Sequence, residues 1–174
     1  DLAASLGHLG DSGHADVVAA VEDAIRRIVA AGKPAGVNAF AEVLAERGYG
    51  LVLTARRADR LEALAAELRA GHGVAVHVLP LDLADPAASE RVCAWLGERG
   101  LAVDVLVNNA GYGVPGRYAG TAWTAQRDFL QVLVTAVAEL THRLLPGMVA
   151  RGWGRVVNVA SLAALVPAAP GHTL

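Results

Sequence analysis

The sequence predicts an α/β protein built on a doubly wound parallel sheet. Short apolar runs such as Leu51-Val52-Leu53 and Val105-Leu106-Val107 recur along the chain, and amphipathic helical patterns separate them. A continuous apolar run is typical of a strand that helices cover on both faces, as in a parallel sheet. Helical crossovers between such strands are right-handed and bring the strands into one sheet. With 174 residues and a hydrophobic fraction of 54%, the chain is long enough for one such domain.

The expected elements follow an N-terminal helical segment. Apolar residues fall at helical spacing between Ala15 and Ala31, and Gly32 and Pro34 end this helix. Residues 35–39 are expected to form a short strand or a loop. Later helices are expected at 40–47, 60–70, 86–99 and 123–150, the last with a kink or break near Pro146-Gly147. Strands are expected at 50–54, 74–79, 103–107 and 155–159.

Composition and charge argue against several classes of function. The formal net charge of −2 and the lack of basic runs exclude binding to nucleic acid or to an anionic membrane surface. No apolar stretch of membrane-spanning length is evident, and no signal-peptide pattern opens the chain. The single cysteine, Cys93, cannot form an internal disulfide framework, which is typical of a reduced, cytoplasmic protein. The six histidines lack zinc-site spacing, so no metal site is predicted.

Two strand ends carry charged side chains suited to a nucleotide. In an open α/β sheet, ligands bind beyond the carboxyl ends of the strands. Arg56 follows the strand at 50–54, and its guanidinium suits a ribose 2′-phosphate, whereas an acid for a free 2′-hydroxyl is missing there. Asp82, followed by Leu83, comes after the strand at 74–79 and can accept a hydrogen bond from an adenine amino group. Taken alone, Arg56 also fits a solvated helix approach, and Asp82 fits a turn or cap.

Two further strand ends read Asn108-Asn109-Ala110-Gly111 and Asn158-Val159-Ala160-Ser161. Asparagine side chains can tie neighbouring strand ends together, and Ala110 and Gly111 let a ribose or nicotinamide approach the backbone. Ser161 places a hydroxyl where it can hydrogen-bond a substrate carbonyl and stabilise charge that develops there. The plainer interpretations are a turn for the first segment and a helix or turn cap for Ser161.

Together, these segments resemble the short-chain dehydrogenase/reductase family in their order and spacing over residues 40–174. The resemblance also rests on residues 41–49 and on Leu53-Thr54-Ala55-Arg56-Arg57. It implies a Rossmann-like fold, incomplete in this chain, and NAD(P)-dependent hydride transfer to or from a small-molecule carbonyl or alcohol. The implied site roles are NADP preference for Arg56, adenine contacts for Asp82 and Leu83, ribose and nicotinamide contacts for Asn109, Ala110 and Gly111, and catalysis for Ser161.

Three departures from the family pattern lead us to expect an inactive, truncated domain. The glycine-rich turn Gly-x-x-x-Gly-x-Gly is matched at Gly32 and Gly36, but Asn38 stands in the third place. The Tyr-x-x-x-Lys pair that supplies the acid is expected directly after Leu174, where the chain ends. The family often has an asparagine in the long helix that supports a proton-relay water, and the corresponding residue here is Leu133.

Residues 1–39 resemble a different family, the metal-dependent 2-keto-3-deoxy-acid aldolases of the HpcH/HpaI type. The likeness rests on residues 1–7, the helix through Arg27 and residues 31–37. That family is a TIM barrel, and its metal-binding carboxylates and catalytic histidine have no counterpart in this segment. We therefore expect a chimeric chain with a boundary near residue 39.

Two alternatives to an oxidoreductase stay open at this point. A non-catalytic nucleotide-binding α/β domain would bind NADPH without turnover. A fragment of a metal-dependent aldolase would require a divalent metal and pyruvate-type chemistry, but its resemblance covers the smaller part of the chain. If the family's long helices mediate self-association, residues 123–150 are the expected interface of a homo-oligomer.

Overall fold

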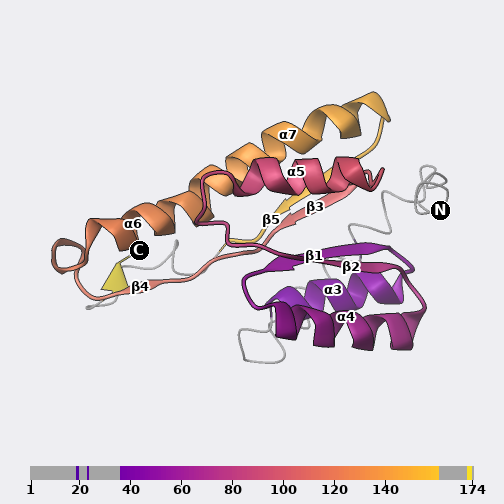
Figure 1. The fold of residues 1–174 in the computed structure, drawn as a ribbon, viewed down its shortest axis with the longest axis horizontal. Coiled ribbons are helices and arrows are strands. Elements are labelled where there is room, and N and C mark those ends of the chain that lie inside the picture. The colour runs from indigo at the N-terminus through magenta and orange to yellow at the C-terminus, as the bar shows by residue number, and fades with distance from the viewer. Residues whose placement is uncertain (1–18, 20–22, 24–35, 161–171, 174) are drawn as a thin grey trace. The chain divides into compact units, whose positions relative to one another are not determined.

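The computed structural model describes residues 36–160 and 172–173, together with Ala19 and Asp23. Ala19 and Asp23 are helical, and the rest of the helix predicted at 15–31 lies outside the described residues. The chain divides into two compact units, one ending at Leu81 and the other beginning at Asp82. Each unit contains a pair of parallel strands with helices, which confirms the predicted α/β class (Figure 1).

The first unit is a two-stranded parallel sheet with two helices. Its elements are α3 (Gly36–Glu46), β1 (Leu51–Ala55), α4 (Ala58–His72) and β2 (Val76–Pro80). The strands pair from Leu51 opposite Val76 to Ala55 opposite Pro80. Helices α3 and α4 lie side by side and contact the strands (Figure 1). The two strands lie within two residues of their predicted positions.

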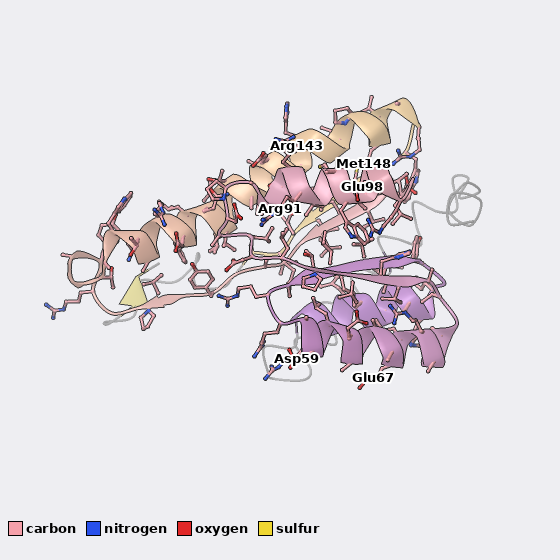
Figure 2. All side chains as sticks on the ribbon, in the orientation of Figure 1. Asp59, Glu67, Arg91, Glu98, Arg143 and Met148 are labelled. Carbon is pink, nitrogen blue, oxygen red and sulfur yellow. The ribbon has the colours of Figure 1, made fainter. Side chains whose placement is uncertain are left out.

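Helix α4 has an apolar face that is buried and a glycine that ends the helix. Leu61, Leu64 and Leu68 recur at helical spacing and are all buried. Asp59 and Glu67 are exposed on the face that points away from the strands (Figure 2). The helix ends where Gly73 adopts φ +68°, a left-handed conformation that favours glycine, and its N–H donates to the carbonyl oxygen of Arg69.

Helix α3 begins four residues earlier than predicted, so the strand or loop expected at 36–39 is wrong. Ala39 is buried one helical turn before Val43, which is fully buried, and the two therefore share the face that packs into the core. The additional turn depends on this tertiary burial, which the local pattern does not reveal.

The second unit contains the α-helices α5, α6 and α7, two short helical turns, η1 and η2, and a second pair of parallel strands. Its elements are α5 (Ala88–Glu98), β3 (Val105–Asn108), β4 (Val114–Pro115), η1 (Tyr118–Gly120), α6 (Trp123–Leu130), η2 (Gln131–Thr135), α7 (Ala136–Ala150), β5 (Arg155–Asn158) and β6 (His172–Thr173). Strands β3 and β5 pair in parallel, and β4 pairs with β6 in antiparallel fashion. Helices α5 and α7 lie side by side (Figure 1).

The long helix predicted at 123–150 is present. Of the kink or break expected near Pro146-Gly147, the break is wrong and the kink stays a prediction. Helix α7 continues through Pro146 to Ala150, and the irregular part is instead the π-helical turn η2. By length and composition, Trp123–Ala150 is also able to cross a membrane. No stretch of this kind is expected from the sequence, because the charged residues Glu139 and Arg143 interrupt the apolar run. One helix of this length and composition does not identify a membrane protein, because core helices of soluble proteins share both features.

The connection from α7 to β5 is closely packed. Gly154 has no room for a side chain, since a Cβ atom there would lie 2.5 Å from Cγ and 2.7 Å from Sδ of Met148. Met148 lies on α7 and is only 2% exposed (Figure 2). Arg151 fixes the end of the same helix, because its guanidinium donates to Oδ1 of Asp104 at 2.8 Å and to the carbonyl oxygen of Val103 at 2.7 Å.

Candidate functional site

The carboxyl end of the first strand pair presents an exposed arginine. The parallel ladder is extended past β1, where the N–H of Leu81 donates to the carbonyl oxygen of Ala55 at 3.0 Å. Arg56 follows directly, is exposed, and has no hydrogen bond or ion pair with the described part of the chain. Arg57 is the N-cap of α4 and makes no side-chain capping hydrogen bond. A helix N-terminus beside a free guanidinium is a favourable environment for a phosphate group.

The second predicted strand-end charge, Asp82, forms a turn. Its Oδ1 accepts a hydrogen bond from the N–H of Ala84 at 3.0 Å, and its carbonyl oxygen accepts one from the N–H of Asp85 at 3.2 Å. This is the plainer interpretation of Asp82 from the sequence, and it is confirmed. The carboxylate is exposed and keeps acceptor capacity beyond this bond, so a contact to adenine stays a prediction. Leu83 beside it is half-buried.

Two asparagines join the strand ends of the second unit. Asn108 and Asn158 are the last residues of β3 and β5 and lie opposite each other in the register. Nδ2 of Asn108 donates to Oδ1 of Asn158 at 2.8 Å, and the N–H of Val159 donates to the carbonyl oxygen of Asn108 at 2.9 Å. The prediction that asparagines tie neighbouring strand ends together is thereby confirmed. The segments 109–111 and 159–160 consequently start from adjacent points.

A third side chain, Thr141 of α7, reaches the same place. Nδ2 of Asn108 lies 3.4 Å from Oγ1 of Thr141, and Oγ1 of Thr141 donates to the carbonyl oxygen of Val137 at 2.7 Å. Nothing in the local sequence singles out Thr141, because its partner Asn108 is 33 residues away. The one available signal is a polar residue on a half-buried face of the long helix.

The loop after β3 is open on one side and bordered by apolar groups on the other. Asn109 is half-buried, whereas Ala110 and Gly111 are exposed. A Cβ atom at Gly111 would lie 4.0 Å from Cγ of Leu133, so the π-helical turn η2 adjoins the loop at this point. Tyr112 extends the apolar border, since its ring packs edge-on against the ring of Phe129 in α6, with centroids 5.8 Å apart.

Ser161 lies outside the described residues, so its catalytic role stays a prediction. Among the described residues, no group of three or more His, Cys, Asp or Glu side chains is placed to hold a metal ion. Burial raises the pKa of the Cys93 thiol, and this disfavours the thiolate that a nucleophile requires.

Most of the chain, including these strand ends, matches a known protein family. The model of the short chain dehydrogenase family matches residues 27–172. The chain is 36% identical over 141 residues to a serine 3-dehydrogenase of Agrobacterium fabrum, with 78% of this chain and 53% of that protein covered. It is 37% identical over 137 residues to a sulfoacetaldehyde reductase of Chromohalobacter salexigens, with the same coverage of 78% and 53%. The chain thus spans about half the length of these relatives.

Solved structures agree with this match. The L-sorbose reductase of Gluconobacter frateurii, solved with NADPH and L-sorbose, has a TM-score of 0.71 at 33% identity, covering 77% of this chain and 52% of the reductase. A short-chain dehydrogenase of Sphingobium yanoikuyae in complex with NADPH has a TM-score of 0.69 at 36% identity, covering 76% and 51%. The predicted doubly wound, Rossmann-like fold is confirmed. The family match begins at residue 27, and the expected aldolase boundary near residue 39 stays a prediction.

Proposed function

The chain belongs to the short-chain dehydrogenase/reductase family, and on this basis we propose that it binds NADPH as part of an oxidoreductase acting on a small-molecule carbonyl or alcohol. The guanidinium of Arg56, which is exposed and has no partner among the described residues, lies beside the N-terminus of α4, and this observation carries the choice of NADPH over NADH. Similar proteins solved with NADPH support the same choice. The names of the similar enzymes, among them a serine 3-dehydrogenase and a sulfoacetaldehyde reductase, support a small-molecule substrate.

The side chains along the strand ends fit such a cofactor. Arg56 would hold the 2′-phosphate, and the exposed Asp82 with Leu83 would border the adenine. In the second unit, the half-buried Asn109 with the small, exposed Ala110 and Gly111 would leave space for the ribose and nicotinamide, which supplies the hydride.

The protein itself would position the substrate and stabilise charge. The bond between Asn108 and Asn158 holds the start of the cofactor loop beside the segment that leads to Ser161. Ser161 would donate to the carbonyl oxygen, where negative charge develops during reduction. The side chain of Leu133 has no polar atom, so this side chain would not itself hold a water molecule beside the loop.

Fluorescence titration of the purified chain with NADPH and NADH tests the cofactor. We expect saturable binding of NADPH with a dissociation constant at least about tenfold below that of NADH, because the 2′-phosphate adds a charge-assisted hydrogen bond. Equal affinity for the two cofactors would contradict the proposed NADP preference, and binding of neither would contradict the whole assignment. The second candidate, a non-catalytic nucleotide-binding domain, also predicts NADPH binding, and hydride transfer from NADPH to a small aldehyde or ketone would contradict it.

We also propose a cytoplasmic homo-oligomer, supported by the single cysteine and by an apolar helix face. Large apolar side chains are exposed along α6, η2 and α7 in the second unit, namely Trp123, Leu130, Val134, Leu145 and Val149. Val149 is the most exposed of them, at 69%. A surface of this kind is typical of an interface between subunits.

Light scattering after size-exclusion chromatography tests the oligomer. Val149→Glu is expected to shift the chain toward the monomer, because a carboxylate would be buried without a partner in the interface. Ala94→Glu, at an exposed position of α5, is the matched control and should leave the assembly unchanged. A wild-type chain that is monomeric at all concentrations would contradict the proposal.

A further inference from the structure

The hydrogen bond between the side chains of Asn108 and Asn158 can run in either direction, because each amide has both a donor and an acceptor. In the structure Nδ2 of Asn108 donates to Oδ1 of Asn158 at 2.8 Å. If both amides were rotated by half a turn, Nδ2 of Asn158 would donate to Oδ1 of Asn108, and the bond would be equivalent. The two arrangements differ in what the exposed Asn158 offers at the strand end. Among the described residues, its Nδ2 has no acceptor in the first arrangement, and its Oδ1 would have no donor in the second.

Thr141 removes this ambiguity. Its hydroxyl donates to the carbonyl oxygen of Val137 at 2.7 Å, so in this arrangement its oxygen is an acceptor toward any other group. The second hydrogen of Nδ2 of Asn108 points to that oxygen at 3.4 Å. In the rotated arrangement, Oδ1 of Asn108 would face the hydroxyl oxygen instead. The two oxygens would then repel each other unless the hydroxyl gave up its 2.7 Å bond to Val137 for a donor contact at the 3.4 Å separation from Asn108.

We propose that Thr141 is a positioning residue that sets the direction of the hydrogen bond between Asn108 and Asn158. It thereby keeps the side-chain N–H groups of Asn158 available as donors beside the segment leading to Ser161. The orientation also fixes Asn108, the residue that begins the cofactor loop. The importance of this direction for the cofactor rests on the proposed function, whereas the direction itself does not.

Two variants of Thr141 separate the hydroxyl from the shape of the side chain. Thr141→Val keeps the β-branched shape and loses the acceptor, and Thr141→Ser keeps the acceptor. We expect the valine variant to bind NADPH roughly three- to tenfold more weakly, the range of one neutral hydrogen bond. The serine variant should restore wild-type affinity. Equal losses in both variants, or none in the valine variant, would overturn the role in cofactor binding.

The side-chain amide signals of Asn108 and Asn158 in a ¹⁵N–¹H correlation spectrum provide a readout that does not depend on the cofactor. Assignment uses Asn108→Asp and Asn158→Asp. The wild type and Thr141→Ser should show one set of signals for each amide, and Thr141→Val should show two sets or exchange broadening. A single unchanged set in the valine variant would overturn the proposal. If wild type fails to bind NADPH while the spectra behave as expected, only the proposed function fails.

Discussion

Replacing Gly154 by alanine is expected to lower the free energy of unfolding of the second unit by about 2–3 kcal/mol, the upper part of the range for overpacking. The new Cβ atom would lie 2.5 Å from Cγ of Met148, well inside van der Waals contact. Met148 is 2% exposed and has little room to move, so α7 or the start of β5 must shift. Urea unfolding followed by tryptophan fluorescence measures the effect, because all three tryptophans lie after Asp82.

Gly97→Ala is the matched control for this substitution. Gly97 lies within α5, and an added Cβ atom would meet no heavy atom within 4 Å. Alanine has the higher helix propensity, so this variant should be as stable as the wild type or up to about 1 kcal/mol more stable. If Gly154→Ala unfolded at the same urea concentration as Gly97→Ala, the close packing of the connection before β5 would be refuted.

Replacing Arg56 by alanine is expected to weaken NADPH binding roughly 10- to 100-fold, which corresponds to the loss of one hydrogen bond between charged groups. NADH lacks the 2′-phosphate, and its affinity should therefore be unchanged. The exposed Arg56 has no partner among the described residues, so the substitution should not change the free energy of unfolding. Titrations with both cofactors at low ionic strength give the largest difference, because salt screens exposed charges.

Arg99→Ala controls for the change in net charge. Arg99 follows α5 and precedes β3, and therefore lies at the end of the strand opposite to the cofactor loop. It lies over the ring of Trp95 and pairs with Glu98, and both contacts are at the surface. NADPH affinity should stay at the wild-type value in this variant. A similar loss of NADPH binding in both arginine variants would show that overall charge, and not the position of Arg56, determines cofactor choice.

The strands and the asparagine pair could be predicted from the sequence because their signals are local. The strand expected at 50–54 is Leu51–Ala55, and its short apolar run records burial directly. The asparagines fall at the ends of two such runs, and the carboxyl ends of neighbouring parallel strands meet at one edge of a sheet. Their contact could therefore be predicted, although 50 residues separate them.

Features that depend on contacts across the fold could not be predicted in this way. The acceptor role of Thr141 depends on a partner from another element, and the need for glycine at position 154 depends on the packing of Met148. Pro146 is a poor guide to the irregular part of the long helix, which lies at Gln131–Thr135 and has no residue that marks a π-helical turn. The early start of α3 follows from burial of Ala39 against the core.

The opposed asparagines also bear on how the chain reaches its native alignment. Most residues of strands β3 and β5 are valine or leucine, and neighbouring valines along a strand can take one another's places when the register shifts. A shift by one residue would place Asn108 opposite Val157 or Val159 and leave its amide without the partner at 2.8 Å. Correct and misaligned pairings therefore differ in energy as soon as the two distant segments meet. The pair therefore disfavours an alignment of β3 and β5 that is shifted by one residue, whether or not a ligand is bound.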